Sequence, residues 1–200
     1  MLKWLWLAIF FLVATWSAIG AKDTEIWWLE AGPALIGFIV IALTYKAFRL
    51  TPLLYILILL HMIVLFIGAH YTYAEVPFFD WLQNVLGQER NNFDKLGHLM
   101  QGLVPTLIAR EVLLRKQIIS GQAWLNFFSG TFALALSAFY ELLEWWVALV
   151  SEEAAEAFLG MQGYVWDTQS DMGYALLGAI IALVFFKRLH DRQLKVTLDL

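Results

Sequence analysis

The sequence predicts an all-α protein, a polytopic bundle of about six transmembrane helices. Of the 200 residues, 61% are hydrophobic and only 15% are charged, whereas a soluble domain has about 45–50% apolar and about 25% charged residues. The apolar residues form blocks long enough to cross a hydrocarbon core of about 30 Å, and most charged residues lie between these blocks. This pattern is typical of an integral membrane protein with the lipid bilayer as its partner.

Six predicted membrane segments cover most of the chain. Their approximate ranges are 2–20, 32–48, 52–73, 93–114, 123–150 and 168–186. The chain is too short for this unit and a soluble domain, so residues 1–200 are expected to form a single integral membrane domain. The first segment also fits a signal peptide, because Lys3 precedes the apolar run and residues 18–20 resemble a cleavage site. Its length and Trp content favour a retained anchor.

The connection between the third and fourth segments contains one more predicted helix. Within residues 77–86, the apolar side chains at positions 78, 79, 82, 85 and 86 share one helical face. A short helix with one apolar face is typical of the membrane–water interface. We therefore expect a short interfacial helix at this point of the chain.

The distribution of Lys and Arg predicts how the helices are oriented. Ten of the 13 basic residues lie near one set of helix ends, which includes both termini, and three lie near the opposite ends. Cytoplasmic loops of membrane proteins carry the excess of Lys and Arg. Both termini are therefore expected in the cytoplasm, and an even number of segments requires the same arrangement.

Two classes of site are excluded by composition. The chain has no cysteine, so disulfides, thiol nucleophiles and cysteine metal sites are absent. It has no basic stripe or nucleic-acid motif, so no nucleic-acid partner is expected. Small residues recur four apart in the fifth and sixth segments, and this spacing favours close helix packing.

Ionisable residues inside the segments are informative, because each costs about 2.5–3.5 kcal/mol at the centre of a bilayer. By helical rise, the polar residues of the fourth, fifth and sixth segments fall in one layer near the outer helix ends. They are Asp94, His98, Gln101, Glu141, Glu144, Asp167 and Asp171. His70, at the outer end of the third segment, is a further candidate. We therefore expect a polar site in the outer leaflet.

Converging carboxylates need compensation, since like charges repel and burial disfavours the charged form. Carboxylate oxygens and one imidazole suit a divalent ion such as Mg, Mn, Ca or Zn. The expected metal ligands are Asp94, His98, Glu141, Asp167 and Asp171, and the expected substrate contacts are Gln101, His70 and Lys95. Shared protons or a cationic ligand are alternative forms of compensation.

The expected ligand of this site is a polar lipid headgroup, or a lipid-linked or envelope substrate. If the site is catalytic, the expected reaction is metal-assisted or acid–base hydrolysis or group transfer, with His98 and Glu144 as catalytic groups. One alternative is a proton-coupled transporter, which should have polar residues through the whole bilayer. In the sequence, only His61, Tyr55 and Thr44 are candidates for such a polar path. Another is a non-catalytic subunit whose acidic layer binds a basic partner.

Some of these residues also have simpler interpretations. Asp94 can serve as a first-turn acid and Asp167 as an N-cap. Glu144 lies beside two tryptophans and can mark the level of the headgroups. His61 is interpreted as a hydrogen-bonded residue inside the bundle.

At the cytoplasmic helix ends, no comparable polar cluster is expected. Glu111 lies four residues before Arg115, and the spacing indicates an ion pair on a helix surface. His190 lies in the tail and supports no prediction.

Three stretches of the chain resemble the YjdF-like family of bacterial inner-membrane proteins. They are residues 92–102 (NFDKLGHLMQG), 137–146 (SAFYELLEWW) and 163–179 (GYVWDTQSDMGYALLGA). The resemblance extends over the whole chain and implies a multi-pass protein of the bacterial inner membrane. It singles out the same polar residues but supplies no reaction.

More distantly, the order of motifs is similar to that of VanZ-like proteins. Those have Asp-Lys-x-x-His at the start of one helix, a Glu in the next helix and an Asp-rich stretch before a Gly-rich last helix. Here residues 94–98 match the first element, Glu141 the second, and Asp167 with Asp171 the third. The usual Arg before the Asp-rich stretch and an Asn at position 171 or 172 are missing. The glycopeptide-resistance role of some VanZ proteins therefore transfers weakly.

Overall fold

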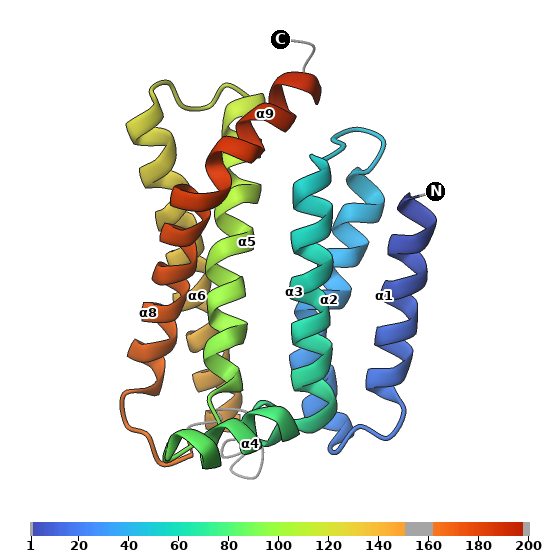
Figure 1. Cartoon of the computed structure of the whole chain (residues 1–200), viewed down its shortest axis with the longest axis vertical. Helices are drawn as coiled ribbons and strands as arrows, with labels where there is room; N and C mark the ends of the chain where they lie inside the picture. Colours follow the sequence, from blue (N-terminus) through green and yellow to red (C-terminus); the bar gives the residue numbers. More distant parts are fainter. Residues whose placement is uncertain (1, 151–161, 198–200) are drawn as a thin grey trace.

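The structure, a computed structural model, describes residues 2–150 and 162–197, and within these ranges every regular element is a helix (Figure 1). The all-α fold class is therefore confirmed. The helices are α1 (Leu2–Ala18), α2 (Thr24–Thr44), α3 (Pro52–Tyr71), α4 (Pro77–Leu86), α5 (Phe93–Arg115), α6 (Gln122–Val150), α8 (Asp167–Ile181) and α9 (Lys187–Thr197). A 3₁₀ turn, η1 (Tyr73–Glu75), precedes α4, and a π-helical turn, η2 (Ala182–Phe186), joins α8 to α9.

The long helices lie side by side in two groups (Figure 1). In one group α1 and α2 pack on α3, and in the other α6 and α8 pack on α5. The groups are joined where α3 packs against α5. Both termini lie at one end of the bundle, and α4 crosses the opposite end (Figure 1).

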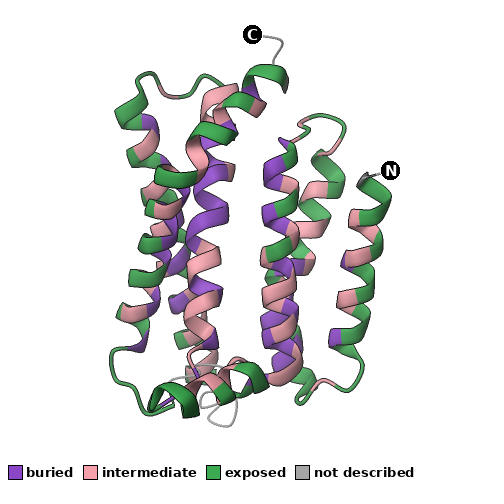
Figure 2. Ribbon diagram, in the orientation of Figure 1, coloured by how far each residue is buried: buried purple, intermediate pink, exposed green. Residues whose placement is uncertain are grey.

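Four of the described helices are long and apolar enough to span a membrane: α2, α3, α6 and the continuous helix Asp167–Val196. The helix α1 is also apolar but shorter. The helix α5 is long but more polar, and its buried residues run along most of its length (Figure 2). A helix enclosed by its neighbours can carry polar side chains that a lipid-facing helix cannot.

Two helix ends differ most from the expected ranges. The helix α2 begins at Thr24 rather than near residue 32, because the side chain of Asp23 accepts hydrogen bonds from the backbone N–H groups of Glu25 and Ile26 (2.8 and 3.0 Å). The last helix continues beyond residue 186, through η2 and α9, to Thr197.

The short helix expected between the third and fourth segments is present as α4. It lies across the end of the bundle (Figure 1), and its exposed side chains include Phe78, Trp81 and Val85. A short helix with exposed aromatic side chains at the end of a membrane bundle is suited to the headgroup region.

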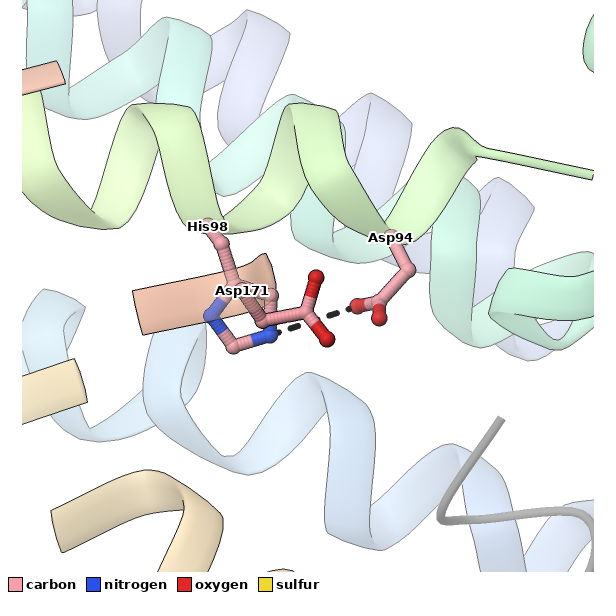
Figure 3. A group of neighbouring side chains, drawn as sticks. All are labelled: Asp94, His98 and Asp171. Atoms are coloured by element: carbon pink, nitrogen blue, oxygen red, sulfur yellow. Dashed lines mark ion pairs between the residues drawn. The ribbon is translucent and has the colours of Figure 1, made fainter. Parts of the chain in front are cut away.

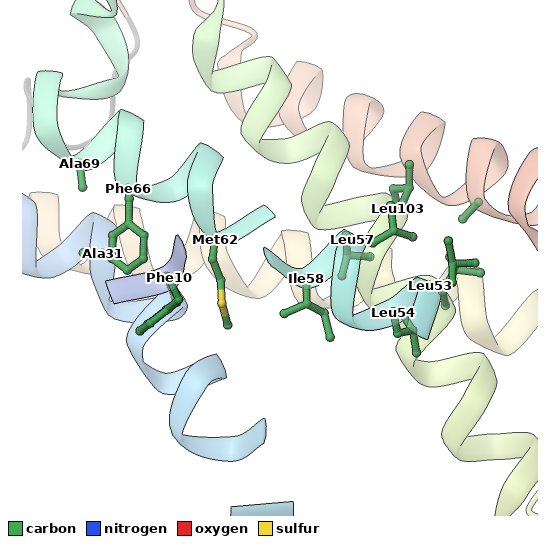
Figure 4. Close-up of a cluster of buried hydrophobic side chains, with 14 of the residues drawn as sticks. Phe10, Ala31, Leu53, Leu54, Leu57, Ile58, Met62, Phe66, Ala69 and Leu103 are labelled. Atoms are coloured by element: carbon green, nitrogen blue, oxygen red, sulfur yellow. The ribbon is translucent and has the colours of Figure 1, made fainter. Parts of the chain in front are cut away.

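A hydrophobic core joins α1, α2 and α3 and reaches α5 (Figure 4). Phe10 of α1 stacks on Phe38 of α2 with 4.3 Å between ring centroids, and meets the ring of Phe66 of α3 edge-on at 5.6 Å. Met62 and Leu103 extend this core toward α5. The aromatic contacts add to the burial of apolar surface and hold α1 against the bundle.

The helices α5 and α8 touch through two glycines. A Cβ atom on Gly102 would overlap the backbone of Ala175, and one on Gly178 would overlap the backbone of Leu99. Small residues at such positions allow helix backbones to approach closely in membranes. The close approach brings the first turns of α8 against α5.

The first prediction concerns this contact. We expect Gly178→Ala to lower the free energy of unfolding by about 1–3 kcal/mol, because the new methyl group must push two backbones apart. Gly173→Ala, on the same helix, has open space around the added methyl group and should be neutral or slightly stabilising. Unfolding of both variants in detergent measures the difference, and equal stabilities would contradict a close contact at Gly178.

A polar cluster, here called the terminal-side cluster, lies near the two chain ends and corrects the expectation for Glu111. It consists of Thr51, Arg110, Glu111, Arg115, His190 and Asp191. Glu111 is fully buried rather than on a surface, and its carboxylate accepts hydrogen bonds from Thr51 (2.9 Å) and Arg115 (2.8 Å). His190 Nε2 lies 2.9 Å from the same carboxylate. The expected ion pair with Arg115 exists, but α9 covers it.

The second prediction tests this cluster. Glu111→Ala should lower the free energy of unfolding by about 3–5 kcal/mol, because it leaves buried basic partners without their carboxylate. Glu75→Gln removes an ion pair with Lys22 in which both side chains are about half exposed, and it should cost about 0–1 kcal/mol. Denaturant titration of both variants in detergent compares the two effects, and similar losses would contradict the interpretation.

Candidate functional site

Asn91 organises the end of the bundle that carries the predicted site. Its Oδ1 accepts a hydrogen bond from the backbone N–H of Phe93 (3.1 Å), and its Nδ2 donates to Asp80 of α4 (2.7 Å). The side-chain amide of Gln162 accepts a hydrogen bond from the backbone N–H of Asn91 (3.0 Å) and donates one to its carbonyl oxygen (2.9 Å). The start of α5 is therefore tied to α4 and to the chain that leads into α8.

Four of the predicted site residues come together at the end of the bundle away from the termini. His98 Nε2 lies 3.4 Å from Asp94 Oδ1 on the same helix and 3.6 Å from Glu141 Oε1 of α6. Asp171 of α8 points to the same place (Figure 3). Asp94, His98 and Asp171 each offer one ligand atom, and these atoms all lie within 4.8 Å of one another. We call Asp94, His98, Glu141 and Asp171 the carboxylate–histidine cluster.

The carboxylate–histidine cluster is buried and only partly paired. Asp171 is 2% exposed, His98 4% and Glu141 8%. In the part of the chain that the structure describes, His98 Nδ1, Glu141 Oε1 and Asp171 Oδ1 are buried atoms with no hydrogen-bond partner. Buried polar atoms nearly always have a partner, because an unsatisfied one costs about 1–3 kcal/mol. The donor set therefore fits a bound ligand that supplies positive charge.

Asp167 lies beside this cluster but is held differently. Its carboxylate forms an ion pair with Arg90, and both side chains are 7% exposed. Arg90 also lies over the ring of Tyr164, 5.5 Å from its centroid. The expected metal ligand Asp167 thus has a buried cationic partner, which the sequence places 77 residues away.

The cluster borders a cavity of about 780 Å³ between α2, α3, α5 and α6. The polar end of the cavity is lined by Glu30, Tyr73, Asp94, His98, Gln101, Tyr140 and Glu144. The predicted site residues Gln101 and Glu144 thus face the cavity, while Asp94 and His98 take part in both features. His61, in the middle of α3, also lines this cavity.

Three residues of the polar end are not among the residues predicted from the sequence: Glu30, Tyr73 and Tyr140. Glu30 is 3% exposed, and it was not considered because it lies before the expected start of the second segment. Tyr73 is in η1, outside the long helices. Burial raises the pKa of the Tyr73 hydroxyl well above its ordinary value, and nearby Tyr140 adds to this, so Tyr73 remains a neutral hydrogen-bonding group.

The structure does not bring His70 and Lys95 into the cluster. His70 Nδ1 lies 3.0 Å from the carbonyl oxygen of Ser17, and its ring stacks on Trp16, so His70 belongs to the contact between α1 and α3. Lys95 donates to Asn92 Oδ1 (2.6 Å) and lies 5.1 Å from the ring centroid of Tyr164. Lys95 therefore lies beside the cluster and contacts Tyr164, which precedes α8 in the chain.

Comparison with known proteins places the chain in a family. Residues 2–192 match the family described as "Predicted membrane protein (DUF2238)". The chain is 48% identical over 184 residues to "Inner membrane protein YjdF" of Escherichia coli (strain K12), an alignment that covers 92% of this chain and 88% of that protein. No solved structure matches. The resemblance to YjdF-like proteins is confirmed, whereas the similarity to VanZ-like proteins is not supported. The chain belongs to the DUF2238 family of membrane proteins.

Proposed function

We propose that this protein holds a divalent cation in the carboxylate–histidine cluster, at the periplasmic face of the bacterial inner membrane. The observation that carries the proposal is the convergence of Asp94, His98 and Asp171 within 4.8 Å, together with the unpaired buried oxygen of Asp171. Three carboxylates and one imidazole form the cluster, and a divalent cation would offset much of their negative charge. Bound there, it would meet the headgroup of a lipid or of an envelope substrate.

The ligand chemistry supports this assignment. Zn binds His nitrogen and carboxylate oxygen at about 2.0–2.2 Å, and Mn accepts a similar set. Ligand atoms up to 4.8 Å apart need small side-chain rotations to reach one ion. Asp94, His98 and Asp171 are the proposed ligands, and Glu141 lies 3.6 Å from the imidazole as a fourth.

The proposed orientation combines charge bias with the arrangement of the helices. Both termini and the loops that carry Lys46 and Lys116 lie at one end of the bundle, and the cluster lies at the other (Figure 1). Excess Lys and Arg mark the cytoplasmic side. Six crossings with both termini inside would place the cluster in the outer leaflet. The inner-membrane relative supports the choice of membrane.

If the cation is catalytic, it would polarise a phosphoryl or carbonyl oxygen of the bound headgroup. Glu144 lines the adjoining cavity beside Asp94 and His98, and it is the proposed acid–base group. Hydrolysis or group transfer at the membrane face is the corresponding reaction class.

The rival functions have less support. A proton-coupled transporter needs polar groups along a path across the bilayer. Beyond Gln101, however, the lining of the cavity is apolar except for His61, Thr44 and Lys116. A subunit that docks a basic partner would need an open acidic surface, whereas Asp171 and Glu141 are buried.

The third prediction is a metal measurement. Elemental analysis of protein purified in mild detergent should find a stoichiometric divalent metal in the wild type and none in Asp171→Asn, which removes a ligand charge. Asp167→Asn is the matched control, because Arg90 already holds that carboxylate, and it should retain the metal. Titration of the purified protein with Mg, Ca and Mn detects binding of ions that are lost during purification. Equal metal binding by wild type and Asp171→Asn, or no binding by the wild type after titration, would contradict the proposal.

The fourth prediction tests the orientation and uses the absence of native cysteine. Single cysteines at Glu89 and Ser120 would lie in exposed loops at opposite ends of the bundle. In intact spheroplasts, a membrane-impermeant thiol reagent should label Glu89→Cys and leave Ser120→Cys unlabelled until the membrane is opened. The reverse pattern would place the cluster on the cytoplasmic side.

A further inference from the structure

We infer that the cavity between α2, α3, α5 and α6 binds one membrane lipid, whose hydrocarbon chain lies along the apolar lining and whose headgroup donates hydrogen bonds at the polar end. This inference deepens the proposed function, on which it rests for the placement of the cation beside the headgroup. The cavity would take an amphipathic lipid whose headgroup carries N–H or O–H groups.

The shape of the cavity suits a chain. Its volume of about 780 Å³ is within the range of about 300–1,000 Å³ that small-molecule sites occupy. It follows α5 from Asp94 through Ile108 to Lys116, and a lipid chain would occupy the part beside the carboxylate–histidine cluster. Ten residues of helix, from His98 to Ile108, rise about 15 Å, which is half of a hydrocarbon core of about 30 Å. A lipid chain of one leaflet with its headgroup beside His98 would therefore end near Ile108.

The walls give the cavity an opening toward the bilayer. Val40 of α2 and Leu136 of α6 both line it, and they are 51% and 37% exposed. The cavity is partly open rather than enclosed, and these two exposed side chains form part of its wall. Side chains at this depth meet lipid rather than water in a membrane protein. A hydrocarbon chain can therefore enter sideways.

The polar end lacks hydrogen-bond donors for two of its acceptors. Within the described ranges, Glu30 Oε2 and Gln101 Oε1 are buried atoms with no hydrogen-bond partner. Glu144 and Asp94 add further carboxylates to this end of the lining. Among the described residues, the basic residue of the lining is Lys116, which lies at the other end of α5. Acceptors and negative charge favour a headgroup with an ammonium group or with hydroxyl groups.

The test uses photoreactive phosphatidylethanolamine with a diazirine in one acyl chain, added to the full-length protein in nanodiscs. The blocking variants are Val40→Trp and Leu136→Trp, which add bulk to the cavity lining from α2 and from α6. The control variants are Leu43→Trp and Leu142→Trp, on the same helices but outside the lining and more exposed than the blocking positions. We expect labelling of the blocking variants to fall about tenfold, because the added rings occupy the space of the chain.

Competition by unlabelled lipids tests the headgroup. Phosphatidylethanolamine supplies an ammonium group and phosphatidylglycerol supplies hydroxyl groups, so competition by one more than the other identifies the donor. Phosphatidylcholine keeps the phosphodiester and the positive charge but has no N–H or O–H group, and it should compete least. Equal labelling of blocking and control variants would overturn the inference, and so would equal competition by phosphatidylcholine.

Metal content and thermal stability are measured on the same samples, so that the two proposals fail separately. If Val40→Trp loses labelling while no variant binds metal, the lipid inference stands and the metal proposal fails. If the wild type binds metal but Val40→Trp is labelled like Leu43→Trp, the lipid inference alone fails. Unchanged stability of Val40→Trp shows that lost labelling reflects a filled cavity rather than an unfolded protein.

Discussion

Burying ionisable side chains inside a helical membrane protein is the constraint on which this structure depends. The helix α5 carries Asp94, His98, Arg110 and Glu111, and each of them would be costly against lipid. The structure avoids that cost by enclosing α5 with α3, α6 and α8, so that its polar faces meet other helices. The close contact at Gly102 and the terminal-side cluster follow from the same need, because they cover α5 on the sides that face α8 and α9.

The two ends of α5 meet this constraint in different ways. At the terminal-side cluster, Glu111 has Thr51, Arg115 and His190 as partners, an arrangement typical of a structural contact. At the opposite end, His98 Nδ1 and Asp171 Oδ1 have no hydrogen-bond partner among the described residues. The difference favours a structural role for the first end and a binding role for the second.

How far the sequence predicts this arrangement depends on what fixes each feature. The apolar blocks predict the helices, and the constant rise of a helix predicts which polar residues share a depth. Depth does not predict the direction of a side chain. His70 is at the expected level but faces Ser17 of α1. The pairing of Asp167 with Arg90 depends on how the chain before α5 meets the start of α8. The burial of Glu111 under His190 depends on how α9 packs on α5.

The terminal-side cluster also has a consequence for the order in which the protein is made. Glu111 and its partner His190 are 79 residues apart in the chain. At about 5–20 residues per second, the ribosome adds that stretch in about 4–16 s. During this interval α3 and α5 exist without the imidazole that α9 contributes to their buried carboxylate. The first helices therefore reach their final packing only after α9 has been synthesised. A chain that stops before His190 lacks part of the protein interior rather than a dispensable tail.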